Sequence, residues 1–201
     1  MEKLTVDQIE WGKSHYQKYL ERLQPLEMDV ENRWIEEERM LQQFQTRFQE
    51  RGRIDREKDF ELLTRWKWPG LWSNYAQNNS PERVRRVTET AFSWGDRKSK
   101  EEFDEIICDQ IGCLSCLDGV RPAMASVILT FWRPNEYTVM DERALLTLSR
   151  ASNEKYRWSH APKASRKYYP EYLRVCTELR DDLGSEFTLR DIDRALWALG
   201  E

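Results

Sequence analysis

One acidic residue follows a short apolar run in a way that suits chemistry. The stretch YTVMDER, residues 137–143, places Asp141 directly after Val139 and Met140. A carboxylate can stabilise a developing positive charge, and it can orient or deprotonate an attacking water. Asp141 is also a good N-cap for a helix that begins at Glu142. The two roles are compatible, so we take Asp141 as the candidate catalytic residue.

A glycine turn lies upstream of this acid, in LDGVRPAMASVIL, residues 117–129. Asp118-Gly119-Val120 predicts a tight turn, and Pro122 predicts the start of a helix. Such a turn exposes backbone N–H groups at a helix N-terminus, which can hold a phosphate oxygen without reading a base. A plain corner between two helices gives the same pattern. The candidate contacts to a nucleic-acid backbone are Gly119, Val120, Arg121, Ala123 and Arg143.

Aromatic and basic residues alternate in RWKWPGLWSNY, residues 65–75. Flat rings beside cations suit a flipped base and its phosphates, and stacking contributes roughly 1–3 kcal/mol per base. The alternative is that Trp66 and Trp72 belong to the hydrophobic core. The candidate residues of a base pocket are Trp66, Trp68, Trp72 and Tyr75.

Charge is unevenly distributed along the chain. The formal net charge is -4, yet residues 61–100 carry eight Lys or Arg against four Asp or Glu, and residues 121–170 carry nine against four. A local basic face on an acidic protein is therefore expected, with ordinary solvated helix surface as the alternative. A third aromatic and basic cluster would contact DNA or form a solvated loop: Tyr156, Arg157, Trp158, His160, Lys163, Arg166 and Lys167.

The composition predicts an all-α fold. Only 8 Gly and 7 Pro punctuate 201 residues, and apolar residues recur at helical spacing between clear start and stop signals. Gly52 and Pro69-Gly70 end two predicted helices, while Ser80-Pro81 and Thr188 begin two others. A further helix is expected to begin at Ser99 and to be interrupted at Gly112. The sequence lacks a signal peptide and a membrane-length apolar run, which predicts a cytoplasmic protein.

The four cysteines raise the question of a metal site. Cys108, Cys113 and Cys116 lie close together, and Cys176 is distant. Three of them fall in or beside an apolar helix, where buried free thiols are common. The two histidines, His15 and His160, add no ligand or triad pattern. We therefore expect neither a metal site nor a cofactor.

The residues from the turn to the acid resemble the helix-hairpin-helix DNA glycosylase superfamily. The pattern combines Leu117-Asp118-Gly119-Val120, a small apolar helix, and then Val139, Asp141 and Arg143 at the superfamily's spacing. This resemblance implies that the hairpin grips the DNA backbone and that Asp141 faces a flipped nucleotide. It also implies that a residue fills the gap left in the duplex, with Gln77, Asn78 and Asn79 as the candidates for this wedge. The resemblance covers residues 100–150 well and 57–95 loosely.

Three positions depart from the superfamily pattern. Arg121 stands where a second glycine is usual, which either adds a phosphate contact or prevents close approach of the backbone. Asp118 stands at the usual proline and brings a negative charge near the expected phosphate. Ala123 stands where members with lyase activity carry a lysine, so the resemblance implies a monofunctional enzyme.

The sequence thus predicts a glycosylase-like domain over residues 57–201, preceded by a helical extension over residues 1–56. The predicted function is hydrolysis of the N-glycosidic bond of a modified or damaged base in double-stranded DNA, with an abasic site as product. Substrates could include bulky modified cytosines that a defence branch removes from phage DNA, or alkylated bases removed in repair. A non-catalytic helix-hairpin-helix DNA-binding protein and a helical protein–protein adaptor are the alternatives. A monomer is expected, although the sequence leaves the oligomeric state open.

Overall fold

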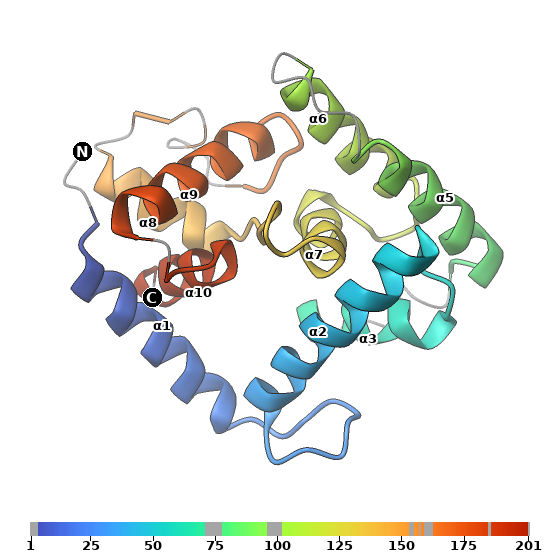
Figure 1. The fold of residues 1–201 in the computed structure, drawn as a ribbon, viewed down its shortest axis with the longest axis horizontal. Helices are drawn as coiled ribbons and strands as arrows, with labels where there is room; N and C mark the ends of the chain where they lie inside the picture. The colour runs from blue at the N-terminus through green and yellow to red at the C-terminus, as the bar shows by residue number, and fades with distance from the viewer. Residues whose placement is uncertain are drawn as a thin grey trace.

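The chain folds into packed helices (Figure 1). The computed structural model describes residues 4–70, 78–95, 102–152, 155–156, 158, 163–184 and 186–200. None of these residues lies in a β-strand, which confirms the all-α prediction. The helices of this part of the chain are α1 (Val6–Glu21), α2 (Arg33–Arg51), α3 (Glu57–Lys67), α5 (Pro81–Ser93), α6 (Phe103–Leu114), α7 (Pro122–Trp132), α8 (Glu142–Ala151), α9 (Tyr169–Leu183) and α10 (Leu189–Leu199).

Several helix ends follow the local signals in the sequence. Ser80 caps α5 by accepting the Arg83 N–H at 3.2 Å, and Pro81 occupies the first helical position. Thr188 and Asp191 form the predicted capping box at the start of α10. Gly52 ends α2 with a φ of 63°, a conformation that costs glycine little.

The prediction that Gly112 interrupts a helix is wrong. Helix α6 continues through Gly112 to Leu114. A single glycine inside a helix costs only about 1 kcal/mol relative to alanine, and Gly112 faces the guanidinium of Arg166. The cap predicted at Ser99 lies outside the described residues.

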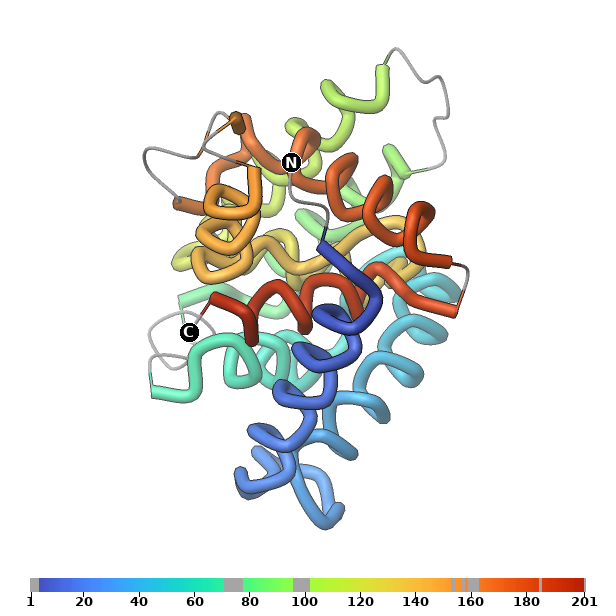
Figure 2. Tube along the Cα trace, turned by 90° about the vertical axis from the view of Figure 1, so that its left-hand side faces the viewer, coloured from blue at the N-terminus to red at the C-terminus, as the bar shows by residue number. Residues whose placement is uncertain are grey.

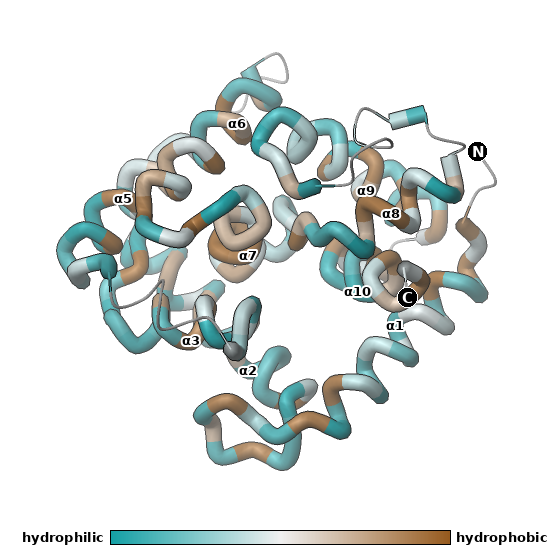
Figure 3. Tube along the Cα trace, turned by 180° about the vertical axis from the view of Figure 1, so that it is seen from behind, coloured by the Kyte–Doolittle hydropathy of each residue, from teal (hydrophilic) through white to brown (hydrophobic). Residues whose placement is uncertain are grey.

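Helix α7 lies at the centre of the fold, with the other helices around it (Figure 1). Each residue from Met124 to Trp132 is buried, and the coil of α7 lies largely on the hydrophobic side of the scale in Figure 3. Met40, Phe44 and Phe48 of α2 join the same core. The first 56 residues therefore share a hydrophobic core with the remainder of the protein. No described helix combines the length and hydropathy that membrane crossing needs.

The first and last helices lie side by side, as Figure 2 shows for α1 and α10. A buried cluster of charges joins them to α2. The Glu37 carboxylate, which is 0% exposed, accepts hydrogen bonds from Arg190 at 2.8 Å, from Arg194 at 2.7 Å and from the Tyr16 hydroxyl at 2.8 Å. Burial alone would raise the pKa of Glu37, but the two guanidinium groups outweigh it and hold that pKa at about 2. Glu37 is therefore ionised inside the protein.

Candidate active site

The extended run before Asp141 is held by side chains rather than by a neighbouring strand. The Val139 N–H donates to the Asp193 carboxylate at 3.1 Å, and the Tyr172 hydroxyl donates to the Val139 carbonyl at 2.9 Å. The Tyr169 hydroxyl donates to the Thr138 carbonyl at 2.8 Å. These partners lie on α9 and α10 and are buried. Since buried backbone groups need partners, the run is fixed on two sides.

The same run returns the chain toward the start of α7. The Met140 N–H donates to the Ser126 Oγ at 2.9 Å, and Ser126 is four residues beyond Pro122. At 1.5 Å per residue, this contact lies about 6 Å along the helix from its first residue. The residue before Asp141 is therefore anchored to the first half of α7.

Asp141 has two partners at this position. Its Oδ1 accepts the Arg143 N–H at 3.0 Å and so caps α8. Its Oδ2 accepts a hydrogen bond from the Lys67 ammonium at 2.5 Å. The Asp141 side chain is 22% exposed and that of Lys67 is 9% exposed. The predicted helix cap is confirmed. It uses only the Oδ1 atom of Asp141, and the Oδ2 atom forms the ion pair with Lys67.

The surroundings favour the charged form of Asp141. Burial by itself would raise the pKa of the carboxyl group. The Lys67 ammonium, with smaller contributions from the Arg143 N–H and its guanidinium, outweighs burial and lowers the pKa of Asp141 below its ordinary value. Asp141 is therefore a carboxylate at neutral pH.

Lys67 is the site residue that sequence reasoning missed. It lies 74 residues before Asp141, so no local spacing connects the two. The signal available was its place between Trp66 and Trp68 in the aromatic and basic stretch. Its contact with Asp141 depends on the packing of α3 against α7, which the sequence does not show.

Asp141 and Lys67 line a pocket of about 180 Å³ between α1, α3 and α10. Aromatic rings of Tyr19, Trp66 and Trp197 contribute to its walls. Drug-sized ligand pockets have volumes of about 300–1,000 Å³. The smaller volume and the flat walls suit one planar ring system beside a carboxylate.

The other predicted pocket residues are distributed differently. Trp66 is partly buried, and its indole N–H donates to Glu37 at 3.1 Å, which fixes the ring as a wall. Trp68 is 39% exposed, with the Lys67 ammonium 5.7 Å from its ring centroid. Trp72, Tyr75 and the wedge candidate Gln77 lie outside the described residues.

The Gly119 turn has the geometry that its sequence predicts. Gly119 has a φ of 77°, a conformation that side-chain-bearing residues rarely adopt. The Val120 N–H donates to the Leu117 carbonyl at 3.1 Å, and the Val120 side chain is buried. Val120 thus closes the turn, and the contact predicted for it with a DNA backbone does not use this N–H group.

Asn79 supports this turn from the other side. It is buried, and its side chain donates to the Asp118 carbonyl at 3.0 Å and accepts the Asp118 N–H at 2.9 Å. A side chain committed to two backbone groups is poorly suited to enter DNA, so we retain Asn78, which is exposed, as the wedge candidate. Arg83 pairs with the Asp118 carboxylate at 3.1 Å, which offsets the negative charge that Asp118 brings near a phosphate.

The remaining candidates for backbone contact are Arg121, Ala123 and Arg143, and of these Arg143 is linked to the Asp141 pocket. Arg121 is exposed and precedes α7 without a side-chain cap. Ala123 lies in the first turn of α7, where backbone N–H groups lack an intrahelical acceptor. The Arg143 guanidinium lies 4.4 Å from the centroid of the Trp197 ring, so it is at the rim of the Asp141 pocket.

The third aromatic and basic cluster contributes to the core. Trp158 is 0% exposed and stacks on Tyr156 with ring centroids 4.7 Å apart. Its companions Arg157 and His160 lie outside the described residues. The four cysteines are free thiols, and the described residues contain no group of three or more His, Cys, Asp or Glu arranged for a metal ion.

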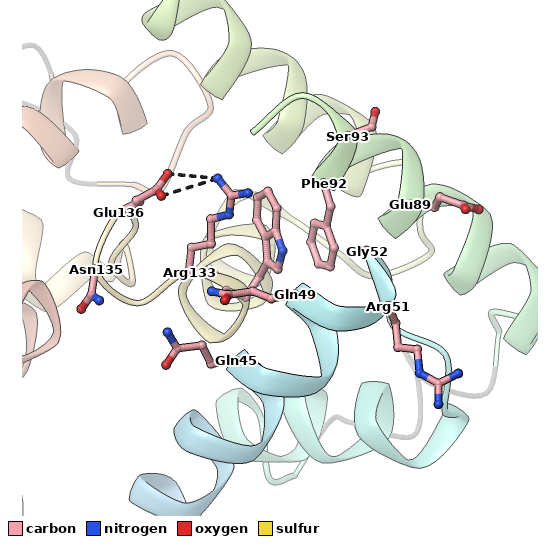
Figure 4. Close-up of a pocket in the computed structure, with 11 residues that line it drawn as sticks. Gln45, Gln49, Arg51, Gly52, Glu89, Phe92, Ser93, Arg133, Asn135 and Glu136 are labelled. Atoms are coloured by element: carbon pink, nitrogen blue, oxygen red, sulfur yellow. Dashed lines mark hydrogen bonds and ion pairs between the residues drawn. The ribbon is translucent and has the colours of Figure 1, made fainter. Parts of the chain in front are cut away.

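A larger pocket, of about 540 Å³, lies at the far end of α7 (Figure 4). Its floor is a stack of Phe92 on Trp132, with centroids 4.3 Å apart. Arg133 pairs with Glu136 at 3.4 Å, as the dashed lines in Figure 4 show, and Glu89 pairs with Arg53 at 3.2 Å. The two carboxylates of this larger pocket, Glu89 and Glu136, are thus each paired with a different arginine. The Asp141 pocket is therefore the better candidate for an active site.

Comparisons of the chain with known protein families, characterised proteins and solved structures found no match. The resemblance to helix-hairpin-helix glycosylases therefore rests on the residue pattern between positions 117 and 143 alone.

Proposed function

We propose that the protein is a monofunctional DNA glycosylase that takes an extruded base into the Asp141 pocket and hydrolyses its N-glycosidic bond. The observation that supports this most is the ionised Asp141 carboxylate in an open, aromatic-lined pocket. A structural cap alone needs neither the Lys67 partner nor the pocket.

The chemistry requires a negative charge at this place. Cleavage of the bond between sugar and base passes through an oxocarbenium-like sugar with positive charge. The Asp141 carboxylate stabilises that charge and accepts the proton of the attacking water, while the departing base takes the bonding electrons. General-base assistance of this kind contributes about 10²–10⁴ in rate.

The DNA backbone is held by the turn and its neighbours. The N–H groups at the start of α7 and the side chains of Arg121 and Arg143 contact phosphates, which positions the duplex without reading its sequence. Trp66 and Trp197 then flank the base. Modified bases that pair weakly are the preferred substrates because they leave the stack at lower cost. Alkylated bases and bulky modified cytosines both belong to this class.

Lys67 does not supply lyase chemistry in this scheme. A lyase needs an amine with a free lone pair to attack the sugar carbon. In this scheme the Lys67 amine is bonded to the Asp141 carboxylate at 2.5 Å and does not attack the sugar. Ala123, at the position where lyases carry their lysine, provides no amine either.

A panel of duplexes tests this function. Each duplex contains one oxidised, alkylated, mismatched or bulky modified base, and alkali reveals abasic sites after incubation. Wild type is expected to yield alkali-dependent breaks on at least one duplex, and Asp141→Asn to lower the rate by at least about 100-fold. Asn also caps helices well, so the variant should retain the fold.

The matched control is Glu142→Gln, which removes the same charge from the adjacent, exposed residue and should leave the rate unchanged. Equal rates for Asp141→Asn and wild type would refute the role of Asp141. Strand breaks without alkali would refute the monofunctional assignment.

A non-catalytic DNA-binding protein is the second candidate, because the Asp141 bond to the Arg143 N–H accounts for this acid as a helix cap. Such a protein would bind duplex DNA through the Gly119 turn and release no base from any duplex of the panel. Asp141→Asn would then leave DNA binding intact.

A further inference from the structure

The outer face of α1 carries aromatic rings and cations in one row. Trp11, His15 and Tyr19 are four residues apart and so lie on one side of the helix. Lys18 and Arg22 fall on the same side, and both are exposed. We define these five residues as the aromatic stripe.

The rings of the aromatic stripe remain accessible. Trp11 is 53% exposed and Tyr19 is 42% exposed, the two largest values among the exposed large hydrophobic side chains of the described residues. The Trp11 ring stacks on His15 with centroids 4.9 Å apart and an interplanar angle of 16°. Packing of α1 on α10 buries Ile9 and Leu20 on another side of the helix, and Tyr19, at the edge of the stripe, contacts Trp197 of α10. The fold therefore does not require Trp11 on the surface.

The aromatic stripe runs into the Asp141 pocket. Tyr19 lines that pocket and contacts Trp197 with ring centroids 5.3 Å apart. Trp197 in turn carries the Arg143 guanidinium. The row of rings that begins at Trp11 thus ends at a residue of the pocket wall.

We infer that the aromatic stripe binds unpaired DNA next to the base in the Asp141 pocket. Exposed rings stack on bases of any sequence, and interleaved cations neutralise phosphates. Bases inside a duplex do not offer their faces, so the occupant is single-stranded. From Trp11 to Tyr19 the stripe is about 12 Å long, which matches about three or four nucleotides stacked at ~3.4 Å. The placement of this DNA next to an extruded base rests on the proposed function, whereas binding of unpaired DNA by the stripe does not.

A consequence is that single-stranded or locally opened DNA is the preferred substrate class. A partner protein fits the stripe less well, because cations alternate with the rings and the row ends in a pocket rather than on a flat apolar patch. The stripe also gives α1 a function that its packing on α10 does not supply.

Binding of a fluorescently labelled, unmodified 12-nucleotide oligothymidine at low salt tests the inference. Trp11→Ala and Tyr19→Ala should each weaken binding by roughly 5- to 100-fold, the loss of about one stacked base. Trp11→Phe should retain most of the affinity because it keeps a ring. Phe103→Ala is the matched control, since Phe103 is 36% exposed on α6, and it should bind like wild type.

Salt dependence separates the two kinds of contact. Lys18→Gln should reduce the slope of log affinity against log salt by about 0.7, whereas Trp11→Ala should leave that slope unchanged. Wild-type affinity in Trp11→Ala and Tyr19→Ala would overturn the inference, as would absence of oligonucleotide binding by wild type. Capture of a protein through Trp11 without oligonucleotide binding would also overturn it.

The two proposals can fail separately. Asp141→Asn should bind the oligonucleotide like wild type, because Asp141 is not part of the stripe. If the stripe binds DNA but no base is released from any duplex or single strand, the proposed glycosylase activity fails and the stripe remains. If bases are released while Trp11→Ala binds and reacts like wild type, only the stripe fails.

Discussion

Two charge clusters lie a few side chains apart and differ in what surrounds them. Around Glu37, the side chains of Arg190 and Arg194 are 5% and 4% exposed and the carboxylate is 0% exposed. The pair of Lys67 and Asp141 is more open, at 9% and 22%. In both clusters cations lower the pKa of a carboxyl group against the effect of burial. The second cluster is the more accessible one to a ligand, although Tyr16 and Arg190 of the first cluster line the same pocket.

The difference in exposure gives the two carboxylate–cation clusters different roles. A buried ion pair is costly to break, because the charge that remains is neither paired nor solvated by water. An ion pair at a pocket wall costs less to break and keeps a charge available. Glu37 therefore stabilises the junction of α1, α2 and α10, and Asp141 is positioned by that junction.

The largest effect is expected at the sealed cluster. Glu37→Gln preserves the shape of the side chain but leaves Arg190 and Arg194 without their shared carboxylate. The free energy of unfolding should fall by about 3–5 kcal/mol, measured by urea denaturation. Glu38→Gln is the matched control, because Glu38 also bonds Arg194 but its side chain is 48% exposed, and it should cost less than about 1 kcal/mol.

At acidic pH, the free energies of unfolding of wild type and Glu37→Gln should become more similar. The pKa of Glu37 is lowered from 4.5 to about 2, so its contribution is present at neutral pH and is lost as pH falls from 4.5 toward 2. If Glu37→Gln and Glu38→Gln lower the free energy of unfolding equally at neutral pH, the buried cluster contributes no more stability than an exposed ion pair.

An intermediate effect is expected at the open pair. Lys67→Met removes the cation that lowers the pKa of Asp141, so burial raises this pKa and the carboxylate protonates at higher pH. The acid limb of kcat/KM should therefore move to higher pH. Stability should fall by about 1–3 kcal/mol because a partly buried charge loses its partner.

Lys58→Met, at an exposed position of the same helix, is the control for Lys67→Met and should keep the wild-type pH profile. An unchanged acid limb in Lys67→Met would contradict a link between Lys67 and the state of Asp141.

The smallest stability effect is expected at the turn. Gly119→Ala places a side chain at a φ of 77°, and the strain exceeds the gain from a stiffer unfolded chain by about 1 kcal/mol. If the turn holds a phosphate, affinity for duplex DNA should fall more steeply than stability. A variant with wild-type DNA affinity and the expected stability loss would leave the turn with a structural role alone.

The sequence predicted the features that depend on neighbouring residues. The capped starts at Ser80 and Thr188 and the left-handed end at Gly52 follow from local backbone needs, and so does the Asp141 cap. The continuation of α6 through Gly112 was missed because tertiary packing outweighs a local penalty of about 1 kcal/mol.

Long-range pairs were beyond the reach of the sequence. No local pattern in the sequence indicates that Arg190 bonds Glu37 across 153 residues. The aromatic stretch contained Lys67, but nothing local indicated its pairing with Asp141. Asn79 was predicted as a wedge from the resemblance to the glycosylases, and its bonds to Asp118 emerge only when the segment before α5 and the Gly119 turn are packed together.

The extended run ahead of Asp141, residues 138–140, restricts how far the Asp141 carboxylate can move. Its amides and carbonyls are committed to Ser126, Asp193, Tyr169 and Tyr172 on three helices, so moving the carboxylate by even a small distance would break several enclosed bonds. If the protein is the proposed glycosylase, adjustment falls on the nucleic acid, which must deliver the sugar to a fixed charge. Discrimination among bases would then follow the cost of pulling each one from its stack, and release rates should rank with the weakness of the base pair that is opened.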